Sequence, residues 1–133
     1  MKNQIFSGKR KTAVAKVKVV EGDGKIFYNR LPYGELGLFH RLALIEPLRI
    51  HERELGEVRH DFHVKTVSGG REGQIQAARL AIAKALISLS GSDVLRKAFI
   101  KYDRHMVIPD SRRKETRKPG DSKARAKRQK SFR

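Results

Sequence analysis

The stretch from Gly70 to Gly91, GREGQIQAARLAIAKALISLSG, decides the fold prediction. Apolar residues recur in it every three or four positions, which is the spacing of one face of an α-helix. This stripe consists of Ile75, Ala78, Ile82, Leu86 and Leu89, widened by Leu80, Ala83 and Ile87. We predict a helix over residues 73–90 that stops at Gly91. Because its apolar face is so wide, the helix has to lie against a sheet.

Residues 11–20, KTAVAKVKVV, show the two-residue alternation of a strand. One face carries only small apolar side chains, namely Ala13, Ala15, Val17 and Val19. The opposite face carries Lys16 and Lys18. The pattern predicts a half-buried strand with a basic outer face.

Three more strands are expected around it. Residues 21–24 read as a turn and residues 25–28 as a short strand, so we predict a hairpin over residues 11–29. Residues 61–68, DFHVKTVS, predict a third strand, and residues 106–108 a fourth.

The remaining segments are predicted to be helical. Residues 36–45 have apolar side chains at helical spacing, and Pro47 should end that helix. Residues 48–57 are charged and predict a second short helix. Ser92 is a suitable N-cap for a last helix over residues 94–100.

The order of these elements indicates the α+β class, arranged as a two-layer α/β sandwich. We divide the chain into a globular domain, residues 1–109, and an extended basic tail, residues 110–133. The tail has eleven Lys or Arg and three acidic residues, so it holds +8 of the total net charge of +17. Its few apolar side chains cannot offset an ordering cost of roughly 1–2 kcal/mol per residue.

So large a positive charge predicts a polyanionic partner, because self-repulsion opposes a compact fold. Nucleic acid, an anionic membrane surface and an acidic protein are the candidates. No apolar run approaches the roughly 18 residues of a membrane-spanning helix, and lysines interrupt the apolar part of the N-terminal segment, so we expect neither a transmembrane helix nor a signal peptide. The absence of cysteine excludes disulfides and fits a reducing cytosol.

Catalytic and metal-binding groupings are poorly represented. His60 and His63 flank Asp61 without a further ligand nearby, and Glu52 and Glu54 have no nucleophile with a spaced base. We therefore predict no enzyme activity, no metal, no cofactor and no small-molecule substrate.

The loop SGGREGQ, residues 68–74, joins a predicted strand to the long helix. It matches neither of the common glycine-rich nucleotide-binding patterns. Its glycines fit a tight turn with positive φ angles, and they equally fit a phosphate of a nucleic acid bound with the help of Arg71. Both interpretations stay open.

Basic residues also gather at the start of the chain and along the first predicted strand. They are Lys9, Arg10, Lys11, Lys16 and Lys18. Such a run is often only a solvated face, but the large overall charge favours a surface that contacts phosphates.

The end of the sequence, KARAKRQKSFR from Lys123 to Arg133, resembles several kinds of basic segment. A nuclear-import signal, a non-specific nucleic-acid arm and a polybasic membrane anchor are the alternatives. The anchor lacks the second signal that stable membrane attachment needs. Alanines between the charges allow close approach to phosphates, so we favour a nucleic-acid-binding arm.

Several blocks of the sequence carry a family resemblance. They are Lys11–Ala15, Gly22 to Asn29, Glu46–Leu48, Gly69–Gly70 with Gly73–Gln74, Ala78–Leu86, Asp103–Arg104, Arg113–Glu115, Lys118–Gly120 and Lys123–Arg133. In this order they resemble the family of the ninth protein of the universal small-ribosomal-subunit set, in its archaeal and eukaryotic form. The resemblance covers essentially the whole chain.

This resemblance implies the fold of the second domain of ribosomal protein S five, with a left-handed βαβ crossover. It implies binding to small-subunit rRNA in the head (the 3′ major domain), beside neighbouring ribosomal proteins of the head, in cytoplasmic ribosomes. It also implies that the tail reaches the anticodon stem-loop of tRNA in the peptidyl (P) site. The alternatives are an enzyme that binds a phosphorylated ligand through the glycine loop and a free-standing nucleic-acid chaperone.

The charge pattern and the resemblance together assign site residues. The rRNA-binding residues are Lys9, Arg10, Lys11, Lys16, Lys18, Arg71, Arg112, Arg113, Lys114, Arg117, Lys118, Lys123, Arg125 and Lys127. The tRNA-proximal residues are Arg128, Gln129, Lys130, Ser131, Phe132 and Arg133.

Overall fold

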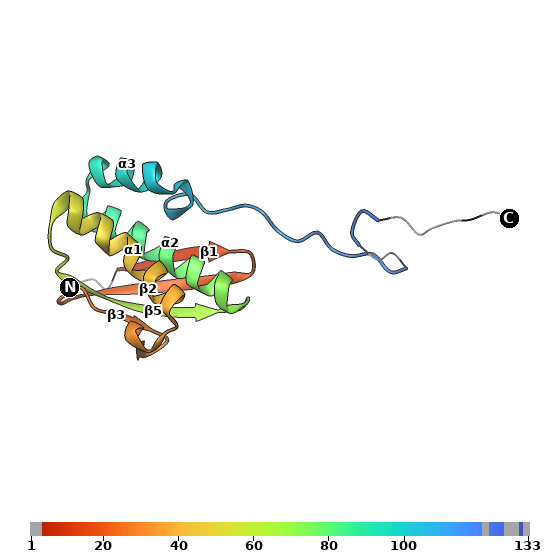
Figure 1. Ribbon diagram of the computed structural model, residues 1–133, viewed down its shortest axis with the longest axis horizontal. Helices are drawn as coiled ribbons and strands as arrows, with labels where there is room; N and C mark the ends of the chain where they lie inside the picture. Colours follow the sequence, from red (N-terminus) through yellow and green to blue (C-terminus); the bar gives the residue numbers. More distant parts are fainter. Residues whose placement is uncertain (1–3, 121–122, 127–130, 132–133) are drawn as a thin grey trace.

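The long helix predicted from the apolar stripe is present in the computed structural model as α2, Arg71–Ser90. The structure describes residues 4–120, 123–126 and 131. The helix ends at Gly91, whose left-handed φ of 59° lets its amide donate to the Ile87 carbonyl. Helices cover one face of a five-stranded sheet (Figure 1), so the α+β class and the two layers are confirmed.

The sheet has the strand order β1-β2-β5-β3-β4. The strands are β1 (Ile5–Arg10), β2 (Ala13–Glu21), β3 (Ile26–Tyr28), β4 (Leu31–Pro32) and β5 (His60–Val67). Neighbouring strands are antiparallel, except that β3 runs parallel to β5. The alternating buried residues of β2 all face the helices, which confirms the predicted half-buried strand.

The predicted hairpin over residues 11–29 is wrong, because β5 lies between β2 and β3. The Asp61 carboxylate of β5 accepts hydrogen bonds of 2.9 Å from the amides of Asp23 and Lys25. These bonds hold the segment after β2 against the start of β5. Alternation identifies a strand, but it does not identify the partner.

Strand β1 was not predicted, and it forms the edge of the sheet beside β2. Gly8 lies in its middle, directly against α2, where an added Cβ would come 2.1 Å from the Ala77 carbonyl oxygen. The glycine interrupts the apolar pattern of this short strand, and it is required because the helix backbone lies so close.

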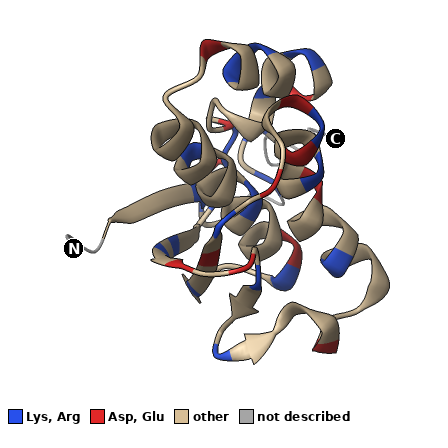
Figure 2. Cartoon of the chain, turned by 90° about the vertical axis from the view of Figure 1, so that its left-hand side faces the viewer, with Lys and Arg blue, Asp and Glu red and all other residues tan. Residues whose placement is uncertain are grey.

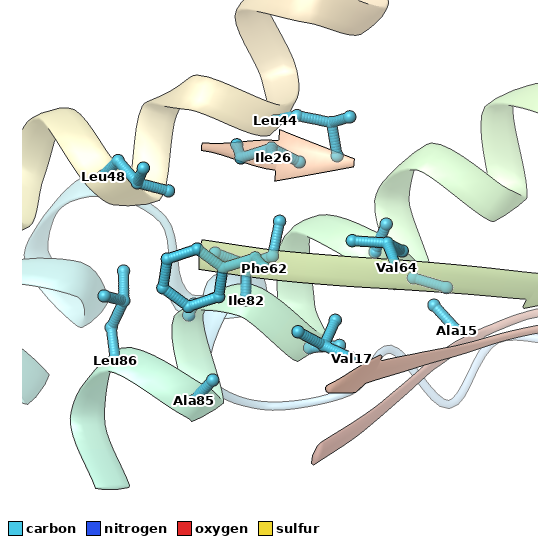
Figure 3. Packing of buried hydrophobic residues seen from close by; sticks show 14 of the residues in the cluster. Ala15, Val17, Ile26, Leu44, Leu48, Phe62, Val64, Ile82, Ala85 and Leu86 are labelled. Atoms are coloured by element: carbon cyan, nitrogen blue, oxygen red, sulfur yellow. The ribbon is translucent and has the colours of Figure 1, made fainter. Parts of the chain in front are cut away.

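Helix α1, Leu38–Leu55, continues through Pro47, so the predicted break is wrong and the predicted second helix is its continuation. Proline inside a helix removes a hydrogen bond. Here Leu44, Pro47 and Leu48 are all buried, and their packing offsets that loss. Figure 3 shows Leu44 and Leu48 directed toward Ile26 and Phe62 of the sheet.

Helix α3, Asp93–Tyr102, begins as expected at Ser92, whose hydroxyl accepts from the Leu95 amide. The predicted strand at residues 106–108 is wrong. Residues Arg104–Met106 instead form the short 3-10 helix η2, which starts where the Asp103 carboxylate accepts from the His105 amide. Met106 is buried at the end of that turn. A second short 3-10 helix, η1, spans Tyr33–Glu35.

Residues 111–120 follow the last buried turn, and each of them is exposed and outside any helix or strand. They lead away from the layered part of the molecule (Figure 1). The division at residue 109 stays a prediction, and Asp110 directly after it contacts the folded part.

Candidate nucleic-acid interface

Asp110 attaches the start of the C-terminal segment to the sheet. Its carboxylate is only 6% exposed and forms an ion pair with Arg10 at the end of β1. The same carboxylate lies 2.7 Å from a guanidinium nitrogen of Arg112. The pair with Arg10 is the contact that joins the segment to the sheet, whereas Arg112 belongs to the segment itself and is 77% exposed.

A depression lies beside this attachment, and we call it the tail-base hollow. It is lined by Arg10, Lys11, Thr12, Arg112, Arg113 and Lys114. Five of these six described residues are cations, and none is acidic. They come from two segments about a hundred positions apart in the chain. Concentrated positive charge of this kind attracts a polyanion such as a phosphate backbone.

The glycine loop lies at the same end of the domain as this hollow. Gly69 has a φ of +70°, and a Cβ there would come 2.7 Å from the Ala13 side chain. The loop therefore needs glycine for its turn, which is one of the two interpretations given above. Arg71 is exposed in the first turn of α2, where Gly70 provides no side-chain cap.

The sheet face opposite the helices, which we call the open face, carries a second group of cations. Lys9, Lys16 and Lys18 are exposed there, as predicted for the two lysines of β2. They are not part of the tail-base hollow, so the basic residues of the first two strands divide into two surfaces. Figure 2 shows Lys and Arg on the strands as well as on the helices.

Sequence reasoning missed Lys65, Phe27 and His63 on the open face. The rings of Phe27 and His63 are stacked, with centroids 4.8 Å apart. The alternation of the sequence could have shown that they lie on the open face, because each alternates with buried neighbours along its strand. What the sequence does not reveal is that β3 and β5 are adjacent.

The segment after the hollow remains strongly basic. Arg117, Lys118 and Lys123 are exposed. Arg125 donates to Glu115 at 2.5–3.1 Å, and this hydrogen bonding lowers the pKa of the Glu115 carboxyl. Of the predicted residues at the end of the chain, Ser131 is exposed. The other predicted positions, Lys127, Arg128, Gln129, Lys130, Phe132 and Arg133, lie outside the described residues.

No three His, Asp or Glu side chains within residues 4–120, 123–126 and 131 are grouped so that they could hold a metal ion. None of the helices in these ranges is long and apolar enough to cross a membrane.

A net charge of +17 with two separate cationic surfaces on a small α+β domain is typical of proteins that bind nucleic acids. Residues 8–133 match the family described as Ribosomal protein S9/S16, and the chain belongs to this family. It is 40% identical over 129 residues to the small ribosomal subunit protein uS9 of Methanococcus vannielii, covering 95% of each chain. It is also 40% identical to the protein of that name from Halobacterium salinarum, covering 96% of each chain.

These matches confirm the predicted family and its archaeal type. The family is one of structural ribosomal proteins, so the chain is not an enzyme. The enzyme alternative, in which the glycine loop binds a phosphorylated ligand, is thereby removed.

Proposed function

We propose that this protein binds rRNA in the head of the small ribosomal subunit, within the 3′ major domain, and that its C-terminal segment reaches the anticodon stem-loop of P-site tRNA. Its family gives it a structural role in translation as part of the small subunit. It works in the ribosome, and hence in the cytoplasm, beside neighbouring ribosomal proteins of the head. On the same basis we expect the β3–α1–β5 crossover to be left-handed.

The tail-base hollow carries this proposal. It places the guanidinium groups of Arg10, Arg112 and Arg113 beside the ammonium groups of Lys11 and Lys114. Arginine binds phosphate through two parallel hydrogen bonds, and lysine adds a compact charge. A phosphate backbone that crosses the hollow would be held by both the sheet and the start of the tail.

Asp110 supports the same proposal because it neutralises only part of the positive charge of the hollow. It pairs with Arg10 and Arg112, while Arg113 and Lys114 are exposed in the part of the chain that the structure describes. The acid thus orders the site without cancelling its charge. Beyond Asp110, the exposed cations Arg117, Lys118 and Lys123 can contact further phosphates of the rRNA backbone.

The rRNA proposal is tested by a pair of variants with equal charge change. Arg113→Gln with Lys114→Gln removes two cations from the hollow, and Arg96→Gln with Lys97→Gln removes two exposed cations from α3. Binding to an RNA fragment of the 3′ major domain is measured over a salt series. The hollow variant should reduce the log–log salt slope by about 1.4–1.8, and the α3 variant should leave it nearly unchanged.

Equal effects of the two variants would show that the hollow is not a specific contact. Sedimentation of the tagged chain from a lysate gives a further readout. Its absence from small-subunit fractions at moderate salt would contradict the ribosomal role and would favour a free-standing nucleic-acid chaperone.

The tRNA contact needs its own experiment. Removal of residues 129–133 should leave incorporation into the small subunit intact and should weaken P-site tRNA binding to purified subunits. Substitution of Lys101 and Lys97 by Gln in α3 provides a control for lost positive charge. Unchanged tRNA affinity in the truncated subunits would refute the contact.

A further inference from the structure

The open face of the sheet bears a row of side chains that runs across four strands. The strand register aligns Ile5 with Lys18, Lys18 with His63, and His63 with Phe27. A second row beside it aligns Lys16 with Lys65. Because directly paired residues point to the same face of a sheet, these side chains form one continuous surface.

Phe27 and His63 form the centre of this surface. Their rings are nearly parallel, with an interplanar angle of 7°, and the centroid distance of 4.8 Å equals the spacing of neighbouring strands. The two rings therefore stand face to face across β3 and β5. The other face of the His63 ring lies on the side of β2, where the flexible side chain of Lys18 is its neighbour in the row.

A depression is located at this place, and the described residues that line it include no acidic residue. Its charged and aromatic lining consists of Lys16, Lys18, Lys65, Arg30, Phe27 and His63. One wall is held in place by Asn29, whose amide group exchanges two hydrogen bonds of 2.9 and 3.0 Å with Thr66. The flat rings suit a nucleotide base, which stacks on aromatic side chains, and the cations around them suit its phosphate.

We propose that the open face binds an unpaired nucleotide of RNA, with the base stacked on the Phe27–His63 pair and the flanking phosphates on Lys16, Lys18 and Lys65. A base inside a duplex is excluded from the stack, because its neighbours in the duplex cover both of its faces. This inference rests on the proposed function and refines it: the tail-base hollow holds phosphates only, and the open face holds a single-stranded element.

The experiment uses the full chain and three RNA probes of equal length. They are an oligouridine nonamer with one central 2-aminopurine, the same nonamer with an abasic central position, and the first nonamer annealed into a duplex. Phe27→Leu and His63→Gln are the test variants. Phe39→Leu is the matched control, because Phe39 is an aromatic residue of α1 that is 82% exposed.

The wild-type chain should quench the 2-aminopurine fluorescence of the single strand and leave that of the duplex unchanged, and it should bind the abasic probe about fivefold more weakly or worse. Phe27→Leu and His63→Gln should each weaken binding of the first probe by a similar factor and remove the quenching. Both should bind the abasic probe as the wild type does. Phe39→Leu should match the wild type throughout.

Equal binding of the abasic and 2-aminopurine probes by the wild type would overturn the inference, as would Phe27→Leu and His63→Gln variants that bind like the wild type. His63 is exposed, so its substitution preserves the fold even if that of Phe27 does not. Loss of subunit incorporation by both variants, with unchanged RNA binding, would assign the face to a protein neighbour instead. Failure of the proposed function is distinct, because the wild-type chain would then be absent from small-subunit fractions.

Discussion

The guanidinium of Arg79 lies 2.8 Å from the carboxylate of Asp103, and this contact joins α2 to the end of α3. The other terminal nitrogen of Arg79 lies 2.7 Å from Glu46 of α1. One arginine, 13% exposed, thus connects all three helices above the sheet. Burial of Asp103 opposes its ionisation, but hydrogen bonds from Arg79 and from the His105 amide outweigh it, so the pKa of Asp103 lies below its ordinary 3.8.

This pKa shift predicts a dependence of stability on pH. A carboxyl group with a lowered pKa in the folded state stabilises the fold above its unfolded pKa, and that contribution is lost as the pH falls through the folded value. Asp103→Asn should therefore lower the free energy of unfolding at pH 7, and its difference from the wild type should shrink below pH 4. Urea unfolding between pH 3 and pH 7 measures this.

Glu57→Gln provides the control, since Glu57 is an exposed acid between α1 and β5. A difference between Asp103→Asn and the wild type that stays constant over the whole pH range would contradict the assignment.

Arg79→Met should destabilise the protein by about 2 kcal/mol, because Glu46 and Asp103 would both lose their partner in a half-buried position. Arg96→Met on the exposed side of α3 should change stability by no more than about 0.5 kcal/mol. Thermal and urea unfolding compare the two variants. In the double variant with Asp103→Asn the losses should be less than additive; additive losses would show that the two residues do not interact.

Gly8→Ala should destabilise the fold by about 1–3 kcal/mol or more, because the added Cβ meets the backbone of α2 and neither element can move aside without loss of packing. Gly70→Ala is the matched control. Gly70 has a φ of −99° and no atom within 4 Å of an added Cβ. Its substitution should be nearly neutral in urea unfolding. Equal stability of the two variants would mean that β1 does not pack on α2 as described.

Asp110→Asn should release the start of the C-terminal segment, because the neutral amide no longer pairs with Arg10 and Arg112. Trypsin should then cleave after Arg112 and Arg113 several times faster, while the folded part keeps its melting temperature within a few degrees. Glu115→Gln removes an acid that pairs with Arg125 farther along the segment. That control should leave cleavage at Arg112 at the wild-type rate; identical rates for both variants would argue against Asp110 as the attachment.

Local patterns were sufficient for the elements that bury one face. The alternation of β2 places its buried residues correctly, and Ser92 begins α3 as its residue type predicts. The predicted stripe of α2 is buried from Ile75 to Leu86, but its last two members, Ile87 and Leu89, are only partly buried. Three further buried residues of α2 lie outside the predicted stripe, namely Ala77, Ala81 and Ala85. Pro47 misled the prediction, because the rule for proline describes an isolated helix. Its cost is offset by burial that cannot be read from neighbouring residues.

In the candidate site, too, some features were predicted from the sequence and others became visible only in the fold. Charge alone indicated a polyanion-binding protein and named the cations of the first strands and of the C-terminal segment. It did not show that Arg10 and Lys11 join the base of that segment, whereas Lys16 and Lys18 face away on the open sheet.

The amino-acid sequence by itself determined the class of fold, the family and the need for an anionic partner, since composition and periodicity are properties of the chain. Only the tertiary structure decided which strands are neighbours, and with that the pairing of Phe27 with His63 and of Arg10 with Asp110. These pairs are 36 and 100 positions apart, respectively. Their proximity follows from the insertion of β5 between β2 and β3, and from the position of the segment after η2 at the end of β1.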